Sequence, residues 1–412
     1  MNILVLNAGS SSFKSSLYRL TESEPKDLVV PLWTGGISWN SAGAATLTAK
    51  TADESIEEER SQTDRQQDIH DLLNWLWSGK TQVIENIHAI DIVGNRVVHG
   101  GDKYRQPTLI DDSVKAEIDR LSIYAPLHNP ANLIGISAIS SIAKNTPQIA
   151  VFDTAFFQDL SAVAYTYPVP NEWLERGIRK YGFHGISHQY CTQRAAELLE
   201  PLGELRLISC HLGNGCSLAA VKAGRCIDTT MGFTPLDGLM MGTRCGSLDP
   251  GIILHLLRER EYTVIELDYI LNFESGLLGV SGVSNDLREI DRAIASGNDR
   301  AKLALEMYID RLASKIASLL PALGGVDALI FTGGVGEHHA GIRAAVASKL
   351  AFLGVEIDPN LNNLSIPPEA GASSDDDRDL ATPQSAVRLL TIHTQEEWEI
   401  ARACWAYLHD RR

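Results

Sequence analysis

An internal repeat of a strand–turn–strand pattern constrains the fold of this chain more than any other feature of its sequence. Residues 2–7, NILVLN, form a short apolar run that ends in the turn AGSSS, and a second run, FKSSLYRL, follows. The pattern returns in residues 205–224, LRLISCHLGNGCSLAAVKAG. Placing Asn7 on His211 aligns both pairs of apolar runs. We therefore predict that one α/β unit occurs twice in the chain.

A second pair of segments, residues 148–156 and 327–337, reads as a further trace of the duplication. Each segment, QIAVFDTAF and DALIFTGGVGE, looks like a buried strand that delivers polar residues or Gly at its C-terminal end. The alternative is chance similarity between two short motifs. Helix start signals follow several strands, so the alternation predicts a mixed or parallel sheet covered by helices. The signals are Asn129-Pro130, Asp249-Pro250, Ser187 and the capping box that begins at Thr394.

Length and composition indicate a two-domain globular protein. The chain has 412 residues, of which 44% are hydrophobic and 21% charged, and this composition excludes disorder, collagen and coiled coil for the whole. Its formal net charge of −16 repels phosphate backbones and anionic lipid heads. We expect neither nucleic acid nor membrane as a partner, and an anionic substrate must be held by a local basic cluster.

Cysteine usage and the N-terminus predict a cytoplasmic protein. The six cysteines form neither a CxxC pair nor a disulfide framework, and no signal-peptide pattern or run of about 18 apolar residues occurs. Two polar stretches, residues 40–68 and 365–384, are expected to be solvated loops without chemistry.

Three Gly-rich turns after strands are candidate anion sites because their backbone N–H groups are exposed without side-chain bulk. They span residues 7–12, 211–215 and 333–336, and the first two are related by the repeat. The sequence lacks the P-loop pattern GxxxxGK[ST] and the HRD and DFG motifs of protein kinases.

Several basic side chains lie in uncharged, turn-like surroundings: Arg96, His128, His184, His188 and Arg244. A guanidinium between an apolar segment and a Gly turn suits a two-pronged contact with carboxylate or phosphate. The alternative for each residue is a structural role, in which its hydrogen bonds are made within the protein and it binds no ligand.

A hard cation that bridges phosphates needs only one or two protein oxygens, and Asn7, Asp153 and Glu396 can supply them. The His and Cys residues lack the spacing of a zinc site. The alternatives are a helix or turn cap for Asp153 and a first-turn helix acid for Glu396.

Nine motifs occur in order along the chain and closely resemble the acetokinase (acetate kinase) family: NAGSSSFK, RVVHGG, PLHNPAN, AVFDTAF, YGFHGISH, HLGNGCS, MGTRCGSLDPG, GGVGE and a C-terminal EE pair. The resemblance implies duplicated ribonuclease-H-like α/β domains of the actin/Hsp70 type, with the active site in a cleft between them. It also implies a homodimer, Mg²⁺ (with Mn²⁺ as a substitute), and the reversible reaction of ATP and acetate to give ADP and acetyl phosphate.

Carried over by motif, the resemblance implies a role for each matching position. The catalytic residues would be Asp153, His184 and Arg244. Acetate would contact Arg96, Val98, Leu127, His128, Phe183 and Pro235, and the metal would be held by Asn7 and Glu396. ATP would contact Lys14, His211, Leu212, Gly213, Asn214, Gly215, Asp286, Leu287, Arg288, Gly334, Val335, Gly336, Glu337 and His338.

The expected domains are residues 1–153 with about 398–412, and residues 154–397, the second binding the nucleotide. Acetate is already ionised at pH 7, so we predict direct in-line transfer in which Asp153 orients metal-bound water or an arginine instead of moving a proton. The alternatives are a propionate or butyrate kinase with the same chemistry, and a non-catalytic ATP-binding module.

Overall fold

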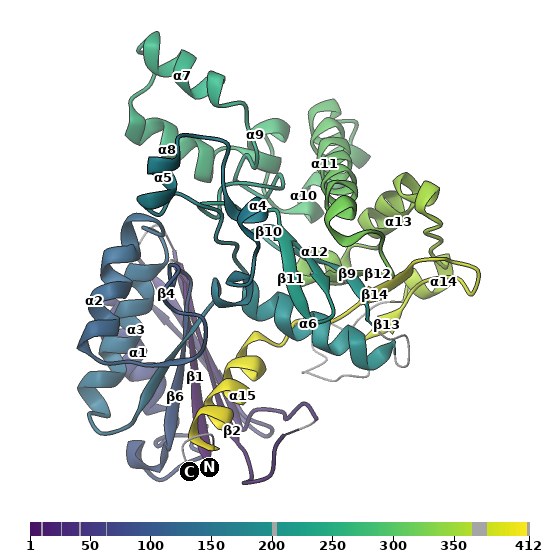
Figure 1. The fold of residues 1–412 in the computed structure, drawn as a ribbon. Coiled ribbons are helices and arrows are strands. Elements are labelled where there is room, and N and C mark those ends of the chain that lie inside the picture. Colours follow the sequence, from purple (N-terminus) through teal and green to yellow (C-terminus); the bar gives the residue numbers. More distant parts are fainter. Residues whose placement is uncertain are drawn as a thin grey trace. The chain divides into compact units, whose positions relative to one another are not determined.

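A computed structural model of the chain describes residues 1–9, 11–25, 27–40, 43–62, 64–199, 204–364 and 377–409. Within these residues the chain forms two compact units, each built on its own sheet (Figure 1). Unit 1 comprises residues 1–155 and 395–412, and unit 2 comprises residues 156–364 and 377–394 of the described parts. Glu396 and Glu397, which the expected boundary assigned to the C-terminal domain, belong to unit 1.

The sheet of unit 1 has the strand order β5-β4-β3-β2-β1-β6-β8-β7. β1 pairs antiparallel with β2 and parallel with β6, which in turn pairs parallel with β8. The apolar runs of β1, β6 and β8 are buried almost throughout, as is typical of central parallel strands. The strands are β1 Asn2–Ala8, β2 Ser12–Arg19, β3 Trp33–Trp39, β4 Ala45–Lys50, β5 Ser55–Arg60, β6 Ile92–Val97, β7 Thr108–Leu109 and β8 Gln148–Phe152.

Helices cover both faces of this sheet (Figure 1). α1 (Arg65–Asn74) and α3 (Asn129–Ile142) cover one face, and α2 (Asp112–Arg120) packs beside α3. The C-terminal helix α15 (Glu396–His409) packs on β1 and β6 from the other face. It approaches β6 so closely that a Cβ added to Gly94 would lie 2.5 Å from Cys404 Sγ. Two short 3₁₀ helices, Ile87–Ala89 and Leu121–Ile123, complete the unit.

The prediction that residues 40–68 form a solvated loop is wrong. Most of the described residues in this stretch form the hairpin β4–β5, and α1 begins at Arg65. The strand β4 alternates strictly: Ala45, Leu47 and Ala49 are buried in the core, whereas Thr48 and Lys50 face solvent. Because two of its three buried positions are alanines, the alternation is weak in the sequence although the strand is regular.

The sheet of unit 2 has the order β11-β10-β9-β12-β14-β13, and its first five strands repeat the order β3-β2-β1-β6-β8 of unit 1. The pairing directions agree as well, which confirms the predicted duplication. The strands are β9 Arg206–Leu212, β10 Cys216–Lys222, β11 Arg225–Thr229, β12 Ala328–Thr332, β13 Arg378–Asp379 and β14 Arg388–Thr391.

The second predicted pair of repeated strands is wrong in its assignment. By position in the sheet, β12 corresponds to β6 and β14 to β8, so residues 148–156 and 327–337 are not equivalents. A buried apolar run followed by a turn describes each of these parallel strands. The local pattern therefore cannot distinguish neighbouring strands.

The helices of unit 2 surround its sheet, with α6 packed on β9 and β12 and α11 packed on β10 (Figure 1). No helix in the described parts of the chain is long and apolar enough to cross a membrane. Two 3₁₀ helices also occur, Ala155–Phe157 and Ala351–Leu353. The α-helices are α4 Ala162–Tyr165, α5 Asn171–Glu175, α6 Gly185–Leu198, α7 Pro250–Arg258, α8 Val264–Phe273, α9 Gly276–Ser281, α10 Leu287–Ala295, α11 Asp299–Leu323, α12 Gly333–His338, α13 Ala340–Lys349 and α14 Pro359–Asn362.

Only one of the four predicted helix starts matches a side-chain cap. Asp249 caps α7 by accepting from Gly251 N at 2.8 Å. Asn129 lies inside α3 and accepts from the backbone of the loop after β6. α6 begins two residues before Ser187, and the Thr394 hydroxyl donates to Ser187 at 2.8 Å. These polar side chains form hydrogen bonds with residues distant in the sequence instead of capping their local helices.

Candidate active site

Unit 1 gathers an arginine, an asparagine and three acids at one edge of its sheet. Asn7 lies near the end of β1, Arg96 near the end of β6, and Asp153 directly after β8. The three strands are parallel, so their carboxyl ends share an edge. α15 begins at the same edge with Glu396 and Glu397. The chain brings these five residues together from its two ends.

The guanidinium of Arg96 is the centre of this cluster. Its Nη2 donates to Asp153 Oδ2 at 2.7 Å and its Nε to Oδ1 at 3.1 Å. Nη1 donates to Asn7 Oδ1 at 3.1 Å and lies 3.5 Å from Glu396 Oε2. Glu397 Oε1 accepts from Asn7 Nδ2 at 3.3 Å. Burial by itself would lower the pKa of Arg96, but the charges of Asp153 and Glu396 raise it above its usual value.

The cluster is acidic because three carboxylates surround one cation. The donor atoms that it can offer to a ligand are hard oxygens. Oxygen donors of this kind suit Mg²⁺, which commonly takes one or two protein ligands and fills the rest of its shell with water and phosphate. No group of three or more His, Cys, Asp or Glu residues in the described chain is arranged to hold a metal alone.

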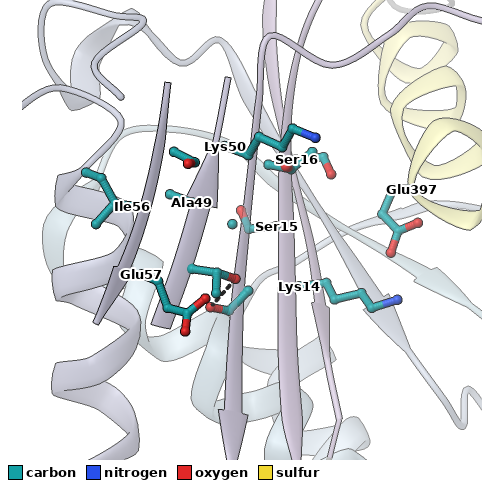
Figure 2. A pocket seen from close by; sticks show the side chains of 13 residues that line it. Lys14, Ser15, Ser16, Ala49, Lys50, Ile56, Glu57 and Glu397 are labelled. Atoms are coloured by element: carbon teal, nitrogen blue, oxygen red, sulfur yellow. Dashed lines mark hydrogen bonds between the residues drawn. The ribbon is translucent and has the colours of Figure 1, made fainter. Parts of the chain in front are cut away.

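A cavity of about 540 Å³ adjoins this cluster on the α15 side of β2–β5 (Figure 2). Lys14, whose partner on β1 is Asn7, and Glu397 line the same side of it. Lys50 and Glu57 line it further along the sheet. Within the described residues Lys14 forms no ion pair, so its ammonium group is available to an anion.

In unit 2, two candidate catalytic side chains converge on Gly215. A Cβ added to Gly215 would lie 3.4 Å from Arg244 Nη1 and 3.4 Å from His184 Nε2. The ring of His184 stacks on that of His211 with centroids 4.3 Å apart. His184 has φ 59°, a left-handed conformation that is uncommon for a residue other than glycine. The backbone is therefore strained at the residue whose imidazole lies beside Gly215.

Arg244 is a largely buried cation without a carboxylate partner in the described chain. Its Nη1 donates to Pro235 O at 3.3 Å and lies 3.9 Å from Met241 Sδ. Burial lowers its pKa below the usual value because no carboxylate offsets the desolvation. A desolvated guanidinium with unused donors is suited to bind an anion.

Segments expected to bind nucleotide lie beside the turn after β9. Gly333 has φ +76°, and a Cβ there would lie 2.8 Å from Leu212 O, so α12 starts directly against β9. Asn214 Oδ1 accepts from Asn285 Nδ2 at 3.2 Å, next to Asp286, which caps α10. The structure therefore brings three of the predicted nucleotide-contacting segments together: 211–215, 286–288 and 334–338.

Glu337, one of those predicted nucleotide contacts, is occupied inside the protein. Its side chain is buried and accepts from Gly333 N at 2.8 Å and pairs with His393 Nδ1 at 2.5 Å. Its carboxylate is therefore committed to holding the start of α12 to the segment after β14. Neighbouring Gly334 has open space around it.

The residues expected to surround the acetyl methyl group come from both units. Val98 and Leu127 belong to unit 1, and Phe183 and Pro235 to unit 2; His128, which was expected to contact acetate, also belongs to unit 1. Val98 and Phe183 are buried, whereas the other three are half-buried.

Two residues of the site were not singled out for a role from the sequence. Glu397 was only part of a noted acidic pair, although it contacts Asn7 while Glu396 contacts Arg96. Ser217 bridges His184 and His188. Its signal was the repeat: Ser217 is paired with His211 as Lys14 is paired with Asn7, but the turn is one residue shorter.

Two sheets that share the order of five strands, each with polar groups at the carboxyl edge of its parallel strands, define a duplicated α/β protein of the actin/Hsp70 type. The chain belongs to the acetokinase family, whose model matches residues 2–402.

Relatives and solved structures match over nearly the whole chain. It is 55% identical to acetate kinases of a Cyanothece strain (98% of each chain covered) and of Gloeobacter violaceus (99% of this chain and 100% of the relative). The structure resembles Porphyromonas gingivalis acetate kinase, with a TM-score of 0.87, 37% identity and 99% of each chain covered. It is also similar to a propionate kinase from Francisella tularensis, with a TM-score of 0.86, 37% identity and 98% of each chain covered.

Proposed function

We propose that this protein is an acetate kinase, which transfers a phosphoryl group directly and reversibly between ATP and acetate to give ADP and acetyl phosphate. Membership of the acetokinase family supports this function. The observation that carries it is the convergence of Arg244 and His184 on Gly215, with no carboxylate of the described chain on the guanidinium.

The reaction needs positive charge on the protein more than it needs a general base. Acetate is ionised at pH 7, so no proton has to leave the nucleophile, and the barrier is repulsion between two anions plus charge that develops on the transferred group. Arg244 and His184 are assigned to that group's equatorial oxygens. Lys14 and the backbone of residues 211–215 are assigned to the phosphates of ATP.

The position of Arg96 modifies its expected role. Of its five N–H donors, Nε and one hydrogen of Nη2 are bound to Asp153, and Nη1 serves Asn7 and Glu396. One Nη2 hydrogen is left for acetate. We therefore assign Arg96 a single contact with the substrate, and assign Asp153 to hold the arginine, which agrees with our prediction that Asp153 is not a base.

Asn7 and Glu396 are assigned to hold Mg²⁺, with Mn²⁺ as a substitute. The donor set fits such an ion because it offers an amide oxygen and carboxylates and no soft ligand. When bound, the ion would supply positive charge that offsets the negative charge of the phosphates. The chain's own contribution is to keep these oxygens oriented through Arg96.

Trapping acyl phosphate with hydroxylamine tests the function. With Mg-ATP and one short-chain acid at a time, we expect the highest kcat/KM on acetate and weaker turnover of propionate, because one methylene changes binding by only about 1–3 kcal/mol. Higher kcat/KM on propionate or butyrate would favour the kinase of that acid. ATP binding without acyl phosphate from any acid would favour a non-catalytic ATP-binding module.

We further infer that the protein is a homodimer in the cytoplasm. All six cysteines are free, as a reducing compartment allows. Exposed groups of large apolar side chains are typical of protein–protein interaction surfaces. Helices α7 and α8 expose several such side chains to solvent: Ile252, Leu254, Val264, Ile265, Tyr269 and Phe273.

Light scattering on the purified chain tests the dimer. Ile265→Asp on α8 should produce monomers, whereas Leu303→Asp on α11 should leave the dimer intact. A monomeric unmodified chain would contradict the proposal.

A further inference from the structure

A chain of buried hydroxyl and imidazole groups supports the ring of His184 from behind. The His184 Nδ1 atom lies 2.9 Å from Ser217 Oγ, which lies 2.7 Å from His188 Nε2. The other ring nitrogen of His188, Nδ1, lies 2.9 Å from Ser209 Oγ. Ser217, His188 and Ser209 are each 0% exposed. These contacts connect Ser209 on β9, through His188 on α6 and Ser217 on β10, to His184 Nδ1. This nitrogen is on the opposite side of the ring from Nε2.

The direction of the hydrogen bonds follows from the far end of this chain. Ser209 has one hydroxyl hydrogen, and among the described residues its only side-chain partner is His188 Nδ1. A buried hydroxyl that merely accepted would leave that hydrogen unbonded. Ser209 therefore donates to His188 Nδ1. Burial lowers the pKa of His188 far below its usual value, so the ring is neutral and carries its one hydrogen on Nε2.

The same reasoning continues to the active site. His188 donates from Nε2 to Ser217, so the single hydrogen of Ser217 is free to point at His184 Nδ1. A neutral His184 that accepts at Nδ1 carries its hydrogen on Nε2. That nitrogen is the one that converges with Arg244 Nη1 on Gly215.

We propose that Ser209, His188 and Ser217 are positioning residues that hold His184 as the neutral Nε2–H tautomer, so that it donates a hydrogen bond to the transferred phosphoryl group. The proposal rests on the assignment of His184 to that group. A hydrogen on Nδ1 would leave the hydroxyl hydrogen of either Ser217 or Ser209 without an acceptor among these groups. His184 is therefore a fixed hydrogen-bond donor in the resting enzyme, and Arg244 supplies the positive charge.

Removing the hydroxyl of Ser217 or of Ser209 from the full-length enzyme tests this series of hydrogen bonds. In Ser217→Ala we expect kcat to fall about tenfold, less than the 10²–10³-fold typical of losing a donor itself, with KM for ATP and acetate within about twofold. Ser209→Ala does not touch His184, yet it should lower kcat severalfold. The double variant should match Ser217→Ala alone, because both changes break one chain. Thr192→Val, which removes a hydroxyl bonded to the His188 backbone, should leave kcat unchanged.

Nitrogen-15 NMR of the His184 ring in the ligand-free enzyme gives a readout independent of turnover. The unmodified protein and Thr192→Val should show a protonated Nε2 and a bare Nδ1, and both serine variants should shift toward a mixture of tautomers. A protonated Nδ1 in the unmodified enzyme, or an unchanged ring in Ser209→Ala, would overturn the proposal. An unmoved kcat in His184→Ala would instead refute the assignment of His184 on which it rests.

Discussion

The two arginines of the site have opposite environments, and this difference determines what substitution should do to each. Arg96 is surrounded by Asp153, Asn7 and Glu396, so its charge is compensated before any ligand arrives. Arg244 is desolvated, and within the described parts of the chain its hydrogen-bond partners are a carbonyl oxygen and a thioether. The first belongs to the architecture of the site, whereas the second is a charge kept for an anion.

Replacing Arg244 by methionine should separate stability from activity. Removing a desolvated, uncompensated charge should raise the free energy of unfolding of the ligand-free protein by about 1 kcal/mol. The same change should lower kcat by about 10²–10³-fold, because a group that stabilises the transition state is lost. Urea unfolding and steady-state kinetics measure the two effects. A less stable variant would show that Arg244 has a structural role instead.

Asp153→Asn should weaken both turnover and the response to metal. The change removes the main charge on Arg96 while Glu396 remains 3.5 Å away, so we expect a stability loss of about 2–3 kcal/mol and a fall in kcat of about 10²-fold. The Mg²⁺ concentration for half-maximal rate should rise. Asp228→Asn, in the partly exposed pair with Lys180, is the control and should cost less than about 1 kcal/mol. An unchanged metal response would contradict our view of Asp153.

At the scale of elements, the glycine in β6 sets how closely α15 can lie. A Cβ on Gly94 would come within 2.6 Å of both Cys404 Sγ and Ile400 Cγ2. Gly94→Ala should therefore lower the melting temperature and cost about 1–3 kcal/mol, and Cys404→Ala in the same chain should recover part of that loss. Gly334→Ala, with no atom within 4 Å, is the control for adding a methyl group. An equal loss at Gly334 would count against the close approach.

The link between α12 and the segment after β14 should make the fold sensitive to acid. Burial by itself would raise the pKa of Glu337, but the hydrogen bonds from His393 and the backbone outweigh it and lower the pKa below its usual 4.5. Its stabilisation is therefore present above pH 4.5 and is lost as the pH falls through the lower value of the folded state.

Comparing Glu337→Gln with the unmodified protein tests this link. We expect a deficit of about 1–3 kcal/mol at pH 7 that shrinks below pH 4.5, as measured by urea unfolding across a pH series. Glu266→Gln on the exposed start of α8 should show a smaller deficit. A deficit that does not change with pH would contradict the assignment.

At the scale of the whole molecule, unit 1 is discontinuous in the chain. Its sheet is complete by residue 155, but α15, from the far C-terminal end, covers one face with Trp398, Ile400, Ala401 and Cys404. Asn7 and the two glutamates of the site also come from opposite ends of the chain. Unit 1 therefore needs the last helix for both its core and its chemistry.

Residues 1–155 alone should not fold, whereas the same residues joined by a flexible linker to residues 395–412 should. The reason is the apolar face of β1 and β6 that would otherwise be exposed. Circular dichroism, size-exclusion chromatography and cooperative urea unfolding distinguish the two outcomes. A cooperative transition of the shorter fragment would show that α15 contributes little to the unit's stability.

Particular residues show how far sequence reasoning reached. The alignment of Asn7 with His211 predicted the duplication, and Arg96 and Asp153 were named as candidate site residues from their motifs. The hairpin of residues 45–60 was missed because two of the three buried positions of β4 are alanines and β5 is mostly charged. Ser187 and Thr394 were read as caps, but each instead serves a residue distant in the chain.

The sequence by itself determined the duplicated α/β class, the family and the residue types of the site, because periodicity and ordered motifs are properties of the chain alone. Only the tertiary structure decided which groups are already occupied: Asp153 on Arg96, Glu337 on His393, and Ser217 between two histidines. Hydrogen-bond partners and desolvation depend on distances between segments that are far apart in sequence, and no local pattern encodes those distances.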